Sequence, residues 1–142
     1  MRHHSIDRMA LIEEQLLAHE EMLVKLQAMQ ALYRAKLPAR LADIDDALQA
    51  CRDTPAEREP IETLHRLLHT MAGAAGSFGF DALGAQARAF EQQVDGWLTA
   101  GAWRERDLDR LGLLLPQLHA YLDHDALQLD RPSDAAKAPE RK

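Results

Sequence analysis

The sequence of 142 residues contains one cysteine, few β-branched residues and no long apolar run. Because it has no internal partner, Cys51 excludes a disulfide framework and fits a reducing cytosol. The scarcity of valine, isoleucine and threonine, with aromatic residues at only 5%, argues against a sheet and favours an all-α fold. No apolar run approaches the roughly 18 residues of a membrane span, and the N-terminus lacks the apolar core of a signal peptide. We therefore expect a cytoplasmic protein with no membrane partner.

The charge balance bears on the class of partner. The chain has 17 basic and 23 acidic side chains and a formal net charge of −6. A general nucleic-acid binder needs a basic surface that displaces counterions from phosphates. The acidic balance therefore argues against nucleic acid as a partner.

The first part of the sequence, over residues 5–51, has the spacing of a helix. From Met9 to Leu37, the residues of one mostly apolar stripe recur alternately every three and four residues. We name this stripe the seam. Pro38 removes a backbone donor and crowds the preceding turn, so we expect either one long helix bent near Pro38 or two helices joined there. The seam resumes at Leu41.

This seam can serve in two ways. It can form a dimer interface between two copies of the chain, or it can pack on the chain's own bundle. Two polar positions within it, His19 and Gln30, weaken the case for a self-sufficient coiled coil.

The remaining sequence predicts further amphipathic helices with short connections. A capping box at Thr54–Glu57 is expected to start the second helix, which runs to about Ser77, although Pro60 leaves the start uncertain by a turn. Asp81 is the expected N-cap of a helix over residues 82–98. Gly101 closes that helix. A last helix over about 107–127, with Pro116 as a second kink candidate, completes an antiparallel bundle.

One helix, over residues 61–80, carries the candidate chemistry. On a helical wheel, His69 lies opposite a stripe of apolar side chains. The members of that stripe are Leu64, Leu67, Met71, Ala74, Ala75 and Phe78, with Leu68 at its margin. We therefore predict that the His69 ring points into solvent. The outer face around it comprises Glu62, His65, Arg66, Ala72, Gly73 and Gly76.

That outer face is unusual because it carries two glycines. A glycine inside a helix costs about 1 kcal/mol relative to alanine, yet Gly73 and Gly76 follow His69 at one and two turns. Together with Ala72 they leave a low-relief strip on which a second macromolecule could settle. An imidazole is largely neutral near pH 7, so its nitrogen can act as a nucleophile. The competing interpretation is a surface histidine beside glycines that serve helix packing.

The segment His69–Phe80 resembles the signature of the histidine-containing phosphotransfer (Hpt) domain, which is His-x-x-Lys-Gly followed by small residues and a further glycine. The likeness continues on the next helix through Leu83, Ala87, Phe90 and Glu91. It covers about residues 32–122 and implies an antiparallel up-down four-helix bundle. We therefore expect an N-terminal helix or helical extension over 1–31, beyond a minimal domain of this family, and the bundle over 32–128. The polar segment 129–142 contains Pro132 and Pro139 and shows no helical period, so we expect a disordered tail there.

The resemblance also implies a function. His69 would be the phosphoacceptor of a two-component phosphorelay, exchanging a phosphoryl group with receiver-domain aspartates of response regulators and, through them, with a hybrid sensor kinase. The docking surface would be formed by His65, Arg66, Ala72, Gly73 and Gly76. Mg²⁺ would belong to the receiver, and the chain would need no cofactor of its own. Ala72 replaces the family's lysine, and Arg66 could substitute for it as an electrostatic partner.

Rival functions have less support in the sequence. We find no glycine-rich nucleotide loop, so the chain is expected to be a phosphotransfer intermediate and not a kinase. His65 and His69 have the i, i+4 spacing of two zinc ligands, but no third ligand stands at a suitable spacing, so no metal site is expected. The departure at Ala72 allows one alternative, a non-phosphorylated module that docks a receiver or sensor protein.

Overall fold

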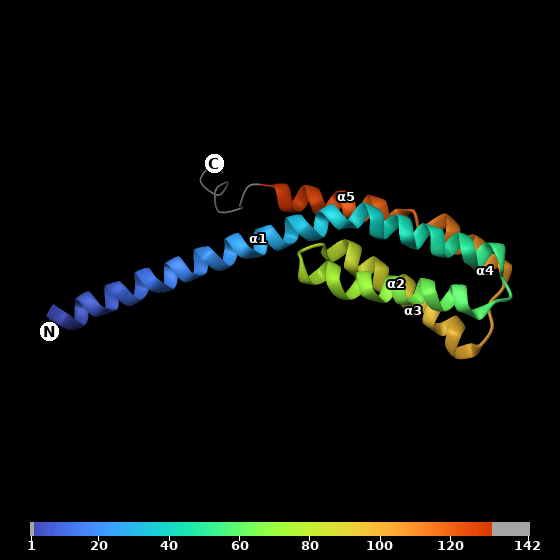
Figure 1. The fold of residues 1–142 in the computed structure, drawn as a ribbon, viewed down its shortest axis with the longest axis horizontal. Helices are drawn as coiled ribbons and strands as arrows, with labels where there is room; N and C mark the ends of the chain where they lie inside the picture. The colour runs from blue at the N-terminus through green and yellow to red at the C-terminus, as the bar shows by residue number, and fades with distance from the viewer. Residues whose placement is uncertain (1, 132–142) are drawn as a thin grey trace, which may run out of the picture. The chain divides into compact units, whose positions relative to one another are not determined.

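The computed structural model describes residues 2–131, with side chains from residue 7, and contains five helices in that range (Figure 1). They are α1 (Arg2–Asp53), α2 (Arg58–Ser77), α3 (Asp81–Ala100), α4 (Glu105–Leu114) and α5 (Gln117–Asp130). No strand occurs among these residues, as the all-α prediction requires. Within the same range, no helix combines the length and the apolar character that a membrane crossing demands.

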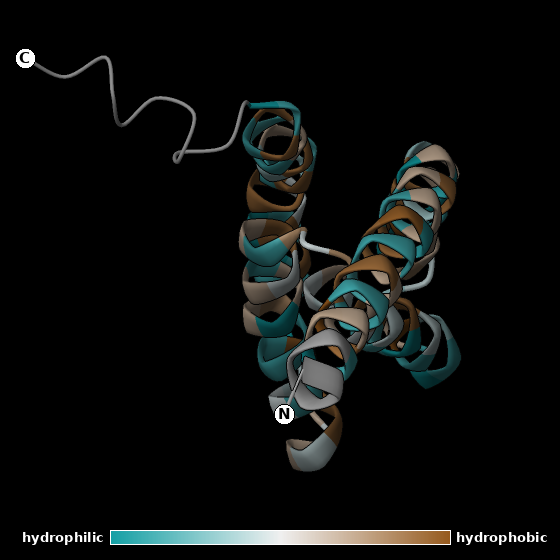
Figure 2. Ribbon diagram, turned by 90° about the vertical axis from the view of Figure 1, so that its left-hand side faces the viewer, coloured by the Kyte–Doolittle hydropathy of each residue, from teal (hydrophilic) through white to brown (hydrophobic). Residues whose placement is uncertain are grey.

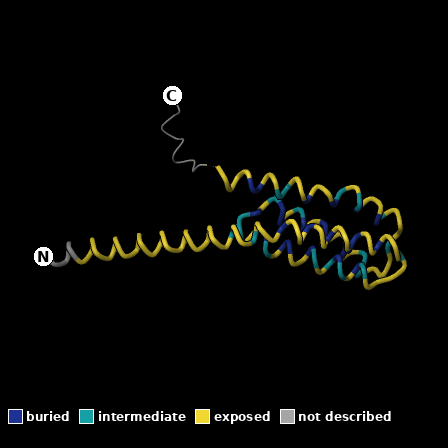
Figure 3. The backbone as a smooth tube through the Cα atoms, turned by 45° about the horizontal axis from the view of Figure 1, so that its top comes forward, coloured by how far each residue is buried: buried dark blue, intermediate teal, exposed yellow. Residues whose placement is uncertain are grey.

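The chain divides into two compact units, residues 1–36 and residues 37–142. In the first unit, residues 2–36 all belong to α1, and the side chains described there are exposed or, at two positions, half-buried. The second unit holds the buried core, which the tube in Figure 3 marks in dark blue. Along each helix of this unit, hydrophobic and hydrophilic residues are interspersed, as expected of amphipathic helices that share one core (Figure 2).

Contacts between helix ends show that α2, α3 and α5 run antiparallel to their neighbours. Arg58, at the start of α2, donates a hydrogen bond to the carbonyl oxygen of Leu98 near the end of α3, at 3.2 Å. The backbone N–H of Leu83, at the start of α3, donates to Asp125 near the end of α5, at 2.8 Å. The start of α2 therefore lies beside the end of α3, and the start of α3 lies beside the end of α5.

The second half of α1 lies antiparallel to α4 and α5. Arg52 forms an ion pair with Asp109 of α4 at 3.4 Å, and Asp45 lies 3.3 Å from the Nε2 atom of His119 in α5. The later residue of α1, Arg52, contacts the earlier of the two partners, Asp109, so α1 runs antiparallel to α4 and α5. Since α4 and α5 follow each other along the same side, the second unit is an up-down bundle whose fourth position is filled by two short helices.

Two sequence predictions at prolines are settled by the structure. The last expected helix is divided at Pro116, which separates α4 from α5. At Pro38, by contrast, α1 continues as one helix, so the alternative of two helices joined there is wrong. Leu37 and Leu41 beside this proline are at most 2% exposed, and their packing offsets the missing backbone hydrogen bond.

The predicted capping box at Thr54–Glu57 is wrong. Helix α2 begins at Arg58, and its N-cap, Glu57, makes no side-chain capping hydrogen bond. The Thr54 hydroxyl instead donates to the carbonyl oxygen of Ala50 at 3.0 Å and so closes α1. The Thr54 hydroxyl bonds to the end of α1 and does not cap α2, because a threonine side chain can reach the carbonyl oxygen four residues before it.

Gly101 ends α3 as predicted, with the left-handed backbone (φ 67°) that glycine adopts without strain. The segment predicted to be a disordered tail begins inside α5, which includes residues 129 and 130. Residues 132–142 of that segment lie outside the described part of the chain.

The N-terminus of α3 is capped from a distant helix and not by Asp81. Asp81 is the first helical residue, and the N-cap Phe80 offers no side-chain acceptor. Asp125 of α5, only 5% exposed, accepts hydrogen bonds from the backbone N–H groups of Ala82 (3.2 Å) and Leu83 (2.8 Å). The carboxylate thus satisfies two donors that a helix start leaves unpaired and faces the positive end of the helix dipole.

We expect Asp125→Ala to lower the free energy of unfolding by about 2–3 kcal/mol, because it leaves buried N–H groups without an acceptor. Urea titration followed by circular dichroism measures this loss. Asp123→Ala, on the exposed face of the same helix, is the matched control and should change stability by less than about 0.5 kcal/mol. Equal stability of the two variants would contradict the capping role.

Candidate functional site

The orientation of α2 places His69 at the edge of the bundle. Its buried stripe consists of Ile61, Leu64, Leu68, Met71, Ala72 and Ala75. On a wheel of 100° per residue, the centre of this stripe lies about 110° from His69 and not opposite it. The His69 side chain is nevertheless 67% exposed, as predicted, but it stands beside α3 and not on the outermost line of α2.

The predicted exposure of Ala72 is therefore wrong, since this residue is only 5% exposed. Small residues bring α2 and α3 close together here. A Cβ atom added to Gly84 of α3 would lie 3.1 Å from the backbone nitrogen of Gly76 and 3.6 Å from the carbonyl oxygen of Ala72. Alanine at position 72 thus serves helix packing, and the sequence pattern does not distinguish that role from a bare outer surface.

Glu91 of α3 positions the His69 ring. Its Oε2 atom lies 2.8 Å from His69 Nδ1, and its side chain is only 13% exposed. A carboxylate accepts hydrogen bonds, so this contact assigns the ring proton to Nδ1. The lone pair then resides on Nε2, the nitrogen that does not face Glu91. An exposed ring with a fixed tautomer is a nucleophile with one defined reacting atom.

His65 lies behind His69 and is half-buried. The two rings stack at a centroid distance of 6.2 Å and an interplanar angle of 14°. His65 Nε2 lies 3.6 Å from Glu91 and 3.5 Å from Asp95, contacts of an ion-pair kind that need a protonated ring, and it makes no hydrogen bond. His65 therefore packs against the His69 ring and is less accessible than it. Among the described residues, no group of three side chains is arranged to hold a metal ion.

The remaining residues that the sequence analysis assigns to a docking surface are open to solvent. Gly73, Gly76 and Arg66 are exposed. A Cβ atom added to Gly73 or Gly76 would meet nothing within 4 Å outside its own turn. The surface beside His69 is therefore bare at both glycines, as the sequence predicts, while Ala72 lies beneath it.

The role of Glu91 was not predicted, although the residue belongs to the family resemblance. It stands 22 positions after His69, on the other helix of a hairpin. The turn at Gly79, which has a positive φ, could have indicated this contact. His69 and Glu91 stand at similar numbers of residues before and after Gly79, so two antiparallel helices joined there place them side by side.

The family model of the Hpt domain matches residues 28–125, which is more than half of the chain. The chain belongs to the Hpt domain family. Comparison with curated proteins and with solved structures found no significant match. Membership makes this Hpt domain a component of phosphotransfer in two-component phosphorelays, in which such domains carry phosphoryl groups and bind receiver-type partners.

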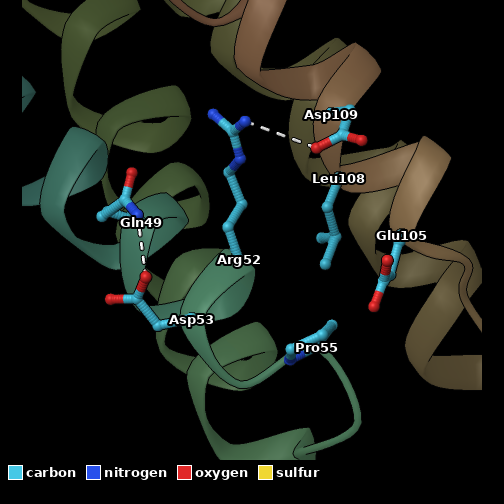
Figure 4. A pocket seen from close by; sticks show the side chains of 7 residues that line it. All are labelled: Gln49, Arg52, Asp53, Pro55, Glu105, Leu108 and Asp109. Atoms are coloured by element: carbon cyan, nitrogen blue, oxygen red, sulfur yellow. Dashed lines mark hydrogen bonds and ion pairs between the residues drawn. The ribbon is translucent and has the colours of Figure 1, made fainter.

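Two other features of this Hpt domain carry no chemistry that we can assign. A cavity of about 330 Å³ lies between the end of α1 and α4 (Figure 4). Four of its polar side chains form pairs, Arg52 with Asp109 at 3.4 Å and Gln49 with Asp53 at 2.9 Å. The thiol of Cys51 is buried, and burial raises its pKa to about 11. It therefore stays protonated in the folded protein near pH 7 and is a poor nucleophile.

Proposed function

We propose that this Hpt domain carries a phosphoryl group on Nε2 of His69 and exchanges it with receiver-domain aspartates of response regulators. The observation that supports the proposal most directly is the hydrogen bond between Nδ1 and Glu91 on a ring that is 67% exposed. In the neutral ring this contact leaves the lone pair on Nε2, the nitrogen that does not face Glu91. The bare surface at Gly73 and Gly76 gives a partner room to bring its phosphoaspartate to that atom.

The transfer step needs positioning more than acid–base catalysis. Nε2 of His69 attacks the phosphorus in line, the N–P bond forms, and the P–O bond to the aspartate breaks, with the carboxylate as leaving group. The proton stays on Nδ1, where the Glu91 carboxylate offsets the positive charge that develops on the ring. In this proposal Mg²⁺ sits on the receiver and stabilises the charge of the phosphoryl oxygens. The reverse step returns the group to an aspartate.

The buried Ala72 leaves this site without the cation that the family's lysine would supply. We propose Arg66, one turn before His69 and exposed, as the electrostatic partner of the phosphoryl oxygens. A guanidinium can pair with two phosphoryl oxygens at once.

The surrounding pathway follows from the same proposal. The donor at the head of the relay would be a hybrid sensor kinase, and both proteins would act in the cytoplasm. The chain itself would be a carrier without its own ATP site, since its sequence contains no glycine-rich phosphate loop.

Incubation with a ³²P-labelled phosphorylated receiver and Mg²⁺ tests the proposal. We expect label on the Hpt domain that is labile in acid and stable in base, the behaviour of a phosphorus–nitrogen bond. Binding without label, repeated with several receivers, would favour the alternative function, a docking module that accepts no phosphate. The replacement of the lysine by Ala72 is the feature that keeps this alternative open.

Variants at Glu91 test its positioning role. Glu91→Ala should slow phosphoryl transfer by roughly 10- to 100-fold, because a hydrogen bond to a charged group is worth about 1.5–3 kcal/mol. Glu91→Gln retains an acceptor for Nδ1 but not the negative charge, and should therefore restore part of the rate. Rapid-quench measurement of label transfer gives both rates, and Gln92→Ala on the exposed side of α3 is the control. Equal rates for the alanine and glutamine variants would contradict the role.

A further inference from the structure

Residues 7–36 of α1, here named the arm, carry large apolar side chains that are exposed. Eleven of them are 40–67% exposed: Met9, Leu11, Ile12, Leu16, Leu17, Met22, Leu23, Val24, Leu26, Met29 and Leu32. Buried apolar side chains begin only at Leu37. The Hpt match begins at residue 28, so most of the arm lies outside the family's fold. The arm is therefore apolar for a reason other than the core of the bundle.

The apolar area of the arm is large enough for a stable interface. At these exposed fractions the eleven side chains, which lie on several sides of the helix, together present on the order of 1,000 Å² of apolar surface. A standard interface buries about 800 Å² on each partner. Seven of the eleven side chains lie where one helical partner can bury them: Met9, Ile12, Leu16, Leu23 and Leu26 on the seam, and Met22 and Met29 beside it. These seven supply the apolar part of the interface, and the other four lie on the remaining sides of the arm.

The spacing of the seam identifies another helix of the same kind as the partner. Its positions alternate by three and four residues without interruption: Met9, Ile12, Leu16, His19, Leu23, Leu26, Gln30 and Tyr33. This 3.5-residue period keeps a seam in register only with a helix that repeats in the same way, because the two then supercoil around each other. A second copy of the chain provides such a helix.

The charges of the arm specify how two copies would align. The first half of the arm, residues 7–22, is acidic: it holds Asp7, Glu13, Glu14, Glu20 and Glu21 against one basic residue, Arg8. The charged residues of the second half, residues 23–36, are all basic: Lys25, Arg34 and Lys36. Parallel arms would place like charges side by side. Antiparallel arms place the acidic half of each copy against the basic half of the other, which is favourable.

We propose that two copies associate through antiparallel arms, with Leu23 of each facing Leu26 of the other in the central layers. In this register His19 faces Gln30 of the second copy. The two polar residues of the seam then share a layer, where an imidazole and an amide can hydrogen-bond and avoid burial against apolar groups. Met22 likewise faces Met29 beside the seam. The pairing requires no phosphotransfer and stands apart from the proposed function.

Sedimentation of the full chain tests the association. We expect a dimer for the wild type and a monomer for Leu23→Glu at the same concentration, because the substitution places two charges in the central layers. Val24→Glu is the matched control: Val24 is the adjacent residue, 64% exposed but off the seam, and this variant should remain dimeric. A monomeric wild type, including one whose arm folds back on its own bundle, or an equal effect of both variants, overturns the proposal.

Disulfide cross-linking tests the alignment. In a Cys51→Ala background, His19→Cys and Gln30→Cys are prepared as separate proteins. Antiparallel arms predict a cross-linked dimer when the two proteins are mixed and little from either protein alone. Cross-linking of each protein alone would show that the arms are parallel. A mixture that sediments as a dimer but forms no cross-link would exclude the proposed register. Either result overturns the proposal.

Discussion

The variant His69→Gln is expected to lose the acid-labile phosphoryl label completely while keeping its fold. Glutamine has no ring nitrogen that can form the N–P bond, yet it is polar and suits a position that is 67% exposed. The label is measured after incubation with a phosphorylated receiver and Mg²⁺. His65→Gln is the matched control one turn away, and we expect it to retain most of the label, because that ring is half-buried and its Nε2 faces Glu91 and Asp95.

The buried thiol supplies a check on folding for this experiment. Cys51 is the only cysteine of the chain, and burial raises the pKa of its thiol to about 11. Alkylation at neutral pH should therefore be slow in the folded protein and fast after unfolding. If His69→Gln protects Cys51 as the wild type does, the loss of label results from the missing imidazole and not from unfolding.

Label that persists on His69→Gln, and disappears in His65→Gln, would show that His65 is the phosphoacceptor.

The variant Gly73→Leu is expected to slow phosphoryl transfer about 100-fold or more without unfolding the bundle. A Cβ atom added at this exposed position meets nothing within 4 Å outside its own turn, so a larger side chain can extend into solvent without displacing the bundle. Leucine would stand one turn from His69, in the space through which the proposed function has a receiver approach. A displacement of about 1 Å between reacting atoms can already reduce a rate 100-fold. Rapid-quench transfer rates measure the loss. Urea titration should show equal or higher stability, because leucine is a better helix former than glycine.

Gly96→Leu is the matched control for Gly73→Leu. Gly96 is also an exposed glycine within a helix and also has nothing within 4 Å of an added Cβ atom, but it lies on the side of α3 turned away from Glu91. Both variants should gain similar stability, and only the substitution beside His69 should slow transfer. Unchanged transfer by Gly73→Leu would show that the receiver approaches His69 from a different direction.

The sequence predicts those features of the site that depend on one helix. The exposure of His69 and of the two glycines follows from the 3.6-residue period, and the end of α3 follows from the freedom of Gly101 to adopt a positive φ. The fold class follows from composition and spacing, and the family match confirms it. These properties are local, so the order of residues is sufficient to infer them.

The features that sequence reasoning misses arise between helices. Ala72 is buried because Gly84 allows α3 to approach it, and an alanine by itself indicates neither a buried nor an exposed position. Asp125 caps α3 from more than 40 residues away, whereas local reasoning favoured Asp81. Pro38 stays within a helix because neighbouring residues pack into the core. In each case tertiary contacts outweigh the local preference.

The cap that Asp125 provides has a practical consequence for anyone who moves this domain into a synthetic signalling protein. The start of α3 is fixed by a residue of the last helix, and α3 carries Glu91, which orients the reacting ring. A graft that ends a few residues too early would preserve every residue around the histidine and still lose the group that anchors its neighbouring helix. The C-terminal boundary of a transplantable fragment is therefore set by the hydrogen bonds between Asp125 and the start of α3, and it must lie beyond Asp125.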